Sequence, residues 1–194
     1  MPNRDAADLL LMILEGRDPV VSGEVLDDFF PQAGSALREA GLLIPDGHEL
    51  VTTAREDHYD APVTLVRADD GSGFGYFSGT AGWVAVDAAR LVRYRVDTTA
   101  FVRALVPLDT VLMPRSPVPV LDSLIWTVGH ITLHRRSIAI WFARRLHDPA
   151  IWSRASTVLR QRPSARLRVI LTSTPADRLP EERLQGSSSF PWRI

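Results

Sequence analysis

The charges of this chain are divided between its two parts, and this division limits how the chain can fold. Residues 1–60 contain 4 Arg and 13 acidic residues, a net charge of −9, whereas residues 61–194 contain 18 Arg and 10 acids, a net charge of +8. The densest basic stretch, residues 135–168, has nine Arg, one acid (Asp148) and three large aromatic residues. Opposite charge blocks predict separate modules that either pair with one another or present the arginines to a polyanion.

Two residue types are missing, and their absence removes many chemistries. The sequence has no Cys, which excludes disulfides, thiol nucleophiles and Cys-ligated metal centres. All 22 cationic Lys or Arg positions are Arg, so a Walker A lysine, a kinase lysine and a pyridoxal phosphate Schiff base are excluded too. The absence of Lys also indicates a GC-rich coding sequence, so arginine content alone does not indicate nucleic-acid binding. The sequence favours a non-enzymatic protein without a cofactor.

The apolar runs are short. The longest, residues 9–14 and 138–143, are six residues each, far below the roughly 20 that span a bilayer. Asp5 and Asp8 stand where a signal peptide carries positive charge. We therefore expect a cytoplasmic protein without a membrane partner.

The first 55 residues predict three short helices followed by a hairpin. A helix over 5–15 ends at Gly16, Ser22 caps a second helix that Pro31 ends, and a third helix over 32–40 ends at Gly41. Two β-capable runs, 42–44 and 50–53, then flank a Pro-Asp-Gly-His turn. Because an Asp-Gly turn between such runs is typical of a hairpin, we expect these two runs to pair.

This order of elements resembles the winged helix-turn-helix superfamily, and residues 36–43, Ala-Leu-Arg-Glu-Ala-Gly-Leu-Leu, resemble the passage from a recognition helix into the wing. The resemblance implies that Gln32, Ser35 and Arg38 face the major groove and that the turn near His48 contacts the DNA backbone. The net charge of −9 departs from the family's usual electrostatics, because such a module repels DNA. A winged helix used for protein contact or dimerisation is the alternative.

The middle of the chain predicts β-structure and then a helix. Residues 62–87 contain three β-capable runs separated by glycine-rich turns, and residues 97–105 favour a helix capped by Asp97 or Thr98. The Gly-Ser-Gly-Phe-Gly stretch at 71–75 lies between two expected strands rather than before a helix. We therefore interpret it as a hairpin loop and not as a phosphate-binding loop.

The remainder predicts a compact basic module after a proline-containing linker at 115–119. We expect strands over 124–128, 137–143 and 166–172, with a helix that Asp148-Pro149 opens between the last two strands. A helix followed by strand, strand, helix and strand resembles part of a restriction-endonuclease-like core. That core needs an acid and an acid-x-Lys pair on adjacent strands, and the second strand here offers neither. The resemblance therefore implies a catalytically inactive relative.

We thus expect an α+β protein with a winged-helix-like module over 1–57, a small β-rich middle over 58–114, a basic strand-strand-helix-strand module over 115–180 and a flexible tail over 181–194. The favoured function is a DNA-associated regulatory protein, and the phosphate-contact candidates are Arg135, Arg136, Arg144, Arg145, Arg154, Arg160 and Arg162. The alternative is a homodimeric interaction module that binds no nucleic acid. Residues 9–14 are apolar around the whole helix, so a second copy or the β-rich middle should cover them.

Other candidate sites are set aside on local geometry. His130 and His134 have the spacing of a helical metal pair, but an extended strand separates them by roughly 13 Å. His58 with Asp60 lies in a polar stretch. The Asp69-Asp70 pair begins a glycine-rich turn that these residues favour for backbone reasons. Two tryptophans, at 126 and 141, lie within expected strands and are assigned to the core.

Overall fold

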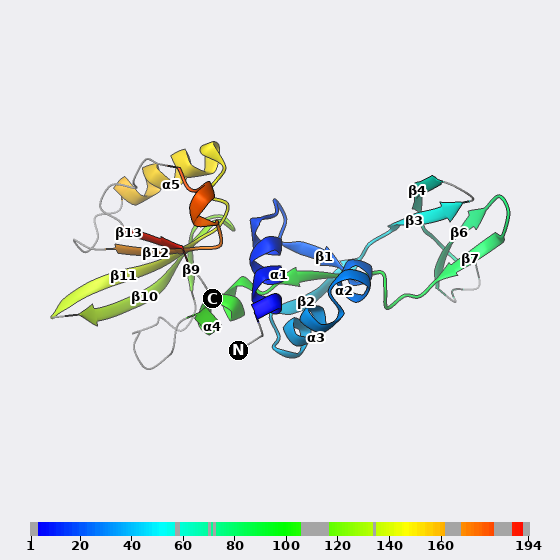
Figure 1. Cartoon of the computed structure of the whole chain (residues 1–194), viewed down its shortest axis with the longest axis horizontal. Helices are drawn as coiled ribbons and strands as arrows, with labels where there is room; N and C mark the ends of the chain where they lie inside the picture. The colour runs from blue at the N-terminus through cyan, green and yellow to red at the C-terminus, as the bar shows by residue number, and fades with distance from the viewer. Residues whose placement is uncertain are drawn as a thin grey trace.

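The computed structural model describes most of the chain. The described residues are 4–56, 59–69, 71, 73–105, 117–133, 135–161, 168–180 and 188–191; for 53–56, 59–61, 133 and 188–191 only the backbone is described. The fold is α+β, with helices and a three-stranded sheet in its N-terminal part and a five-stranded sheet with a helix in its C-terminal part (Figure 1). Of the described residues, no helix is both long and apolar enough to cross a bilayer.

The N-terminal module combines three helices with a three-stranded sheet. Its sheet has the strand order β1-β8-β2, and its elements are α1 (Arg4–Glu15), β1 (Val20–Ser22), α2 (Gly23–Phe29), α3 (Pro31–Glu39), β2 (Leu43–His48) and β8 (Val92–Val96). The expected helix signals act as predicted: the Val25 N–H donates to the Ser22 hydroxyl at 3.2 Å, α3 begins at Pro31, and Gly41 has a positive φ of 68°.

The prediction of a hairpin directly after α3 is wrong. β2 pairs antiparallel with β8, in the register Leu43 with Val96 and His48 with Val92. The run at 50–53 belongs instead to β3, which pairs with β4. The partner of β2 is therefore a strand that lies far along the chain, and we call the segment between these two paired strands the insertion.

The insertion forms two small antiparallel sheets apart from the rest of the molecule, on the right of Figure 1. One contains β3 (Val51–Glu56) and β4 (Tyr59–Thr64); the other contains β5 (Val66–Arg67), β6 (Phe74–Ser78) and β7 (Gly82–Val86). The glycine-rich stretch at 71–75 runs from the β5–β6 connection into β6, as the hairpin interpretation expected. The β-rich middle thus begins at β3 and ends before β8, because β8 completes the N-terminal sheet.

The C-terminal module is a five-stranded sheet of order β13-β12-β11-β10-β9. It follows α4 (Thr98–Leu105) and contains β9 (Val118–Leu121), β10 (Ile125–Leu133), β11 (Arg136–Ala143), α5 (Pro149–Gln161), β12 (Arg168–Thr172), the 3-10 turn η1 (Ala176–Arg178) and β13 (Ser188–Pro191). β9, β10 and β11 are antiparallel, whereas β12 lies parallel to β11 across α5. Asp148 caps α5 by accepting from the Ala150 N–H at 2.9 Å.

Two segments differ from the expectation. Residues 188–191, assigned to a flexible tail, form β13 parallel to β12. Pro119, assigned to a linker, lies within β9, which is an edge strand and therefore tolerates a residue without an N–H donor. Residues 115 and 116 of the expected linker lie outside the described residues.

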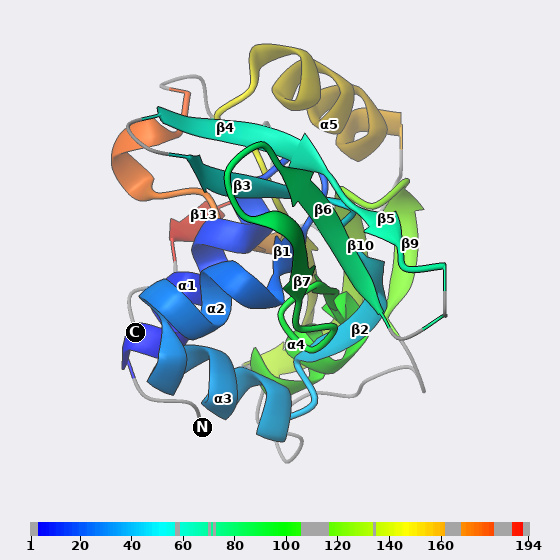
Figure 2. The same ribbon diagram turned by 90° about the vertical axis from the view of Figure 1, so that its right-hand side faces the viewer.

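The two faces of the C-terminal sheet belong to two different cores. On one face, Trp126 and Phe142 join α1, α3 and α4 in one hydrophobic cluster. On the other face, Trp141 and Ile170 pack against α5. The apolar helix α1 therefore lies between its own module and the C-terminal sheet rather than under the β-rich middle, as the two views show (Figures 1 and 2). Met12 remains exposed on α1.

Candidate nucleic-acid interface

Three exposed arginines lie toward one end of the C-terminal module, which we name the basic end: Arg135, Arg136 and Arg160. Arg135 and Arg136 form the tip of the β10–β11 hairpin, and Arg160 lies in the last turn of α5. The backbone brings these places to the same end. Arg168, which starts β12, pairs with Ala139 of β11 and donates to the Leu159 carbonyl of α5 at 3.0 Å.

The basic end has no acidic neighbour on its own elements. Neither β10, β11 nor α5 contains Asp or Glu. Within the described part of the chain, Arg135, Arg136, Arg154 and Arg160 form no ion pair. Arg154 lies exposed two turns earlier on α5. Their guanidinium groups therefore carry charge that no acid among the described residues neutralises.

Arg168 is a buried arginine that contacts both the sheet and the end of α5 near the basic end. Its side chain is buried, with the guanidinium 4.7 Å from the centre of the Trp141 ring. Burial lowers the pKa of Arg168, but an arginine remains protonated at any physiological pH. Arg168 thus holds the end of α5 to the sheet while adding positive potential beneath the exposed arginines.

Arg144, an expected phosphate contact, is placed elsewhere. It is only 3% exposed, and its guanidinium donates to the carbonyls of Leu14, Gly16 and Arg17 at 2.9–3.0 Å and to the Ser123 carbonyl. These first three carbonyls lie at the C-terminal end of α1, where no basic residue of α1 caps them. Burial and then the neighbouring Arg145 lower the pKa of Arg144, against the opposing effect of Glu15 and Asp18. Arg144 is therefore a buried cap between two modules.

Glu15 completes this junction. Its carboxylate accepts from the Arg145 N–H at 2.9 Å, from the Ser173 and Thr174 hydroxyls, and lies 2.8 Å from His147 Nδ1. The side chain of Arg145, also an expected phosphate contact, is mostly covered and pairs with Asp148 at 3.2 Å. The end of α1 is thus joined by hydrogen bonds to the carboxyl ends of β11 and β12.

The expected recognition-helix residues are partly engaged within their own module. Gln32 is exposed, whereas Ser35 donates to Glu39 at 3.0 Å and Arg38 pairs with Asp27 at 2.9 Å beside the Tyr94 ring. Burial acts to lower the pKa of Arg38, but its hydrogen bonds to Tyr94 and Asp27 outweigh burial and raise that pKa. His48 lies 5.9 Å from the Phe74 ring, at the start of the insertion. His48 was expected in a short turn between two paired strands, whereas it is the last residue of β2.

The remaining candidates are placed as follows. Both tryptophans assigned to the core, Trp126 and Trp141, are buried. His130 lies in β10, whereas Arg162, His58, His134 and the side chain of Asp60 lie outside the described residues. Among the residues that the structure describes, no three His, Asp or Glu side chains lie close enough together to hold a metal ion.

Comparison with known proteins gives no relative. No protein-family model, no curated protein and no solved structure matches this chain.

Proposed function

We propose that this protein is a non-enzymatic, DNA-associated regulatory protein that binds the nucleic-acid backbone through its basic end. The observation that carries the proposal is the set of exposed arginines on β11 and α5 that have no acidic partner in the described part of the chain. Arginine neutralises phosphate through a planar set of donors, and such contacts supply most sequence-independent affinity. The winged-helix resemblance of the N-terminal module supports the same class.

The N-terminal module has a secondary part in this proposal. Its arginines on or beside α3 and β8 already face acids, which weakens their attraction for phosphate. Its exposed Asp5, Asp8 and Glu39 repel DNA. We therefore assign contact with the DNA backbone to the C-terminal module and leave Gln32 as the α3 residue whose side chain is free to reach a base.

The test measures binding of a duplex DNA by fluorescence anisotropy across a series of KCl concentrations. The variant R135E/R136E/R160E reverses the basic end, and R4E/R17E/R67E changes net charge equally at exposed arginines elsewhere. We expect the first variant to bind at least about tenfold more weakly, with the salt slope reduced by about 3, since each phosphate contact contributes about 0.9. The second variant should stay close to the wild type.

Two results would contradict the proposal. Equal weakening of both variants would show that only net charge matters, and absence of wild-type binding at low salt would remove DNA as a ligand. Thermal melting of all three proteins checks that each is folded.

A homodimeric assembly module is the second candidate, and an exposed apolar face favours it. Val66, Phe77 and Trp83 share one face of the β5-β6-β7 sheet, and Phe77 is 77% exposed. Apolar faces of this kind often mark protein contacts. Light scattering over a concentration series tests it: a mass that rises from 21.5 kDa toward twice that value, and fails to rise for F77S, supports assembly. A constant monomer mass contradicts it.

A further inference from the structure

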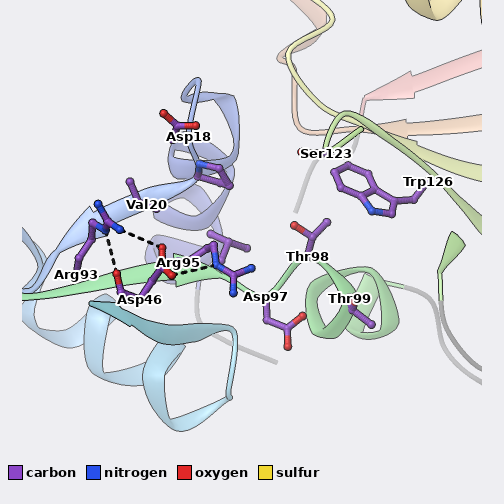
Figure 3. Close-up of a pocket in the computed structure, with 12 residues that line it drawn as sticks. Asp18, Val20, Asp46, Arg93, Arg95, Asp97, Thr98, Thr99, Ser123 and Trp126 are labelled. Carbon is purple, nitrogen blue, oxygen red and sulfur yellow. Dashed lines mark hydrogen bonds and ion pairs between the residues drawn. The ribbon is translucent and has the colours of Figure 1, made fainter. Parts of the chain in front are cut away.

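A pocket of about 630 Å³ opens where the N-terminal and C-terminal modules meet. β1 and β8 form one wall, the first turn of α4 forms the floor, and the β9–β10 turn with Trp126 forms the other wall (Figure 3). The basic end lies at the opposite end of β11 from this junction. The pocket is therefore separate from the surface proposed to bind DNA.

Trp126 presents a hydrogen-bond donor to the pocket. Its side chain is only 8% exposed, yet its indole N–H has no acceptor among the described residues. Figure 3 shows the nitrogen on the edge of the ring that faces α4, inside the pocket. Among the described residues, Arg145 Nε is the only buried side-chain nitrogen or oxygen without a partner, so the indole N–H of Trp126 is open to solvent at the pocket. A molecule in the pocket can therefore offer an acceptor to this N–H.

Further donors face the same space. Arg95 reaches from β8 toward α4, and its Nε lies 3.7 Å from Asp46, which is an ion-pair distance but too long for a hydrogen bond (Figure 3). The Thr98 hydroxyl has no described partner and lines the pocket. α4 begins at this point, so its first-turn N–H groups add positive partial charge. Arg95, Thr98 and Trp126 together form a set of donors suited to oxyanion oxygens.

Three carboxylates also line the pocket, and they narrow the chemistry that a ligand of this pocket can have. Asp46 lies between Arg93 and Arg95, at 3.5 Å and 3.7 Å. Asp97 caps α4 by accepting from the Ala100 N–H at 2.9 Å. Asp18 has no side-chain partner among the described residues and lies at the far wall. A ligand that carries an oxyanion at one end and a hydrogen-bond donor at the other matches both walls.

The buried arginine of the junction also holds the pocket wall. Arg144 Nε donates to the carbonyl of Ser123, and Ser123 has a left-handed backbone with a φ of 51°. A non-glycine residue keeps this conformation only where its surroundings impose it. The wall that carries Trp126 is therefore fixed before any ligand binds, which lowers the entropic cost of binding.

We propose that this pocket binds a small molecule with a terminal carboxylate or phosphate, whose oxyanion accepts hydrogen bonds from Trp126, Thr98 and Arg95 and whose donor group faces Asp18. The proposal is independent of DNA binding. Its position between two modules means that the bound molecule contacts both of them.

The test screens two sets of probes by thermal shift and measures any hit by calorimetry. One set contains the proteinogenic L-amino acids; the other contains inorganic phosphate and the ribonucleoside 5′-monophosphates. We expect at least one compound to raise the Tm, because a ligand that binds only the folded state stabilises it. A hit in the first set assigns a carboxylate, and a hit in the second assigns a phosphate. The amide of an amino-acid hit, or the free nucleoside of a nucleotide hit, should not bind.

Two variants decide whether a hit occupies this pocket. W126F removes the unmatched N–H while keeping an aromatic ring, and W83F makes the same change on the distant insertion sheet. We expect W126F to weaken binding about tenfold or more, the loss typical of a hydrogen bond to a charged acceptor, and W83F to bind as the wild type does. R95Q should weaken binding as well. The proposal is overturned if no probe shifts the Tm, or if a hit binds W126F and R95Q as tightly as the wild type.

Discussion

The arginines of the N-terminal module and those of the C-terminal module differ in whether acidic side chains lie next to them. In the first, Arg38 lies 2.9 Å from Asp27 and Arg90 lies 2.6 Å from Asp28, so these cations meet acids of their own module. In the second, Arg135, Arg136 and Arg160 are exposed on elements that contain no acid. The difference teaches that the placement of acids, more than the number of arginines, decides which surface attracts phosphate. Exposed ion pairs stabilise a fold by only about 0–1 kcal/mol, so their main effect here is on potential.

Arg144 departs most from this contrast, because it is an arginine of the C-terminal module whose side chain binds carbonyls of the N-terminal module. It also carries the largest predicted effect. We expect R144M to lower the free energy of unfolding by about 3–4 kcal/mol, because the α1 carbonyls of Leu14, Gly16 and Arg17 lose a buried cationic donor. Urea denaturation followed by circular dichroism measures this loss. R136M, at an exposed site, should change stability by less than about 0.5 kcal/mol. Equal effects of the two substitutions would contradict the capping role.

The second prediction concerns the other half of that junction. We expect E15Q to lower the free energy of unfolding by about 1–3 kcal/mol, since an amide nitrogen replaces an oxygen that accepts from Ser173, Thr174 or the Arg145 N–H. The matched control is E39Q, whose side chain accepts one exposed hydrogen bond from Ser35. The same denaturation series measures both. If E15Q is as stable as E39Q, Glu15 does not join the modules.

The third prediction has the smallest expected effect and tests the contrast between the arginines of the two modules directly. D27N/D28N removes the acids that face Arg38 and Arg90, so we expect the full chain to bind duplex DNA about two- to threefold more tightly at low salt. Anisotropy measures the change, with D177N as a control on the C-terminal module. A larger gain, together with loss of sensitivity to R135E/R136E/R160E, would move the interface to α3.

Local signals in the sequence predicted the helices well. Ser22, Gly41 and Asp148 act as caps or stops within a few residues of where the sequence places them, because capping is a property of neighbouring residues. The α+β class and the helix between the last two predicted strands follow for the same reason. The periodicity of apolar residues and the turn residues contain that information.

Long-range features were not predictable in this way. The Pro-Asp-Gly turn at 45–47 favours pairing with the next strand, and nothing in the sequence marks β8 as the partner of β2. Arg144 follows a buried run within an arginine-rich stretch, where it was interpreted as a surface residue. The one available signal was that α1 has no basic residue in its last turn, which leaves its carbonyls to a distant donor. The pocket at Trp126 joins residues from four separate parts of the chain.

The position of α1 has a consequence for synthesis of the chain. Its apolar face packs against Trp126 and Phe142 as well as against α3 and Val96. On a translating ribosome, α1 emerges first but its full set of partners emerges only after β11 has left the exit tunnel. During that interval the nascent chain exposes an apolar helix, which is the kind of segment that chaperones bind and that aggregates when unprotected.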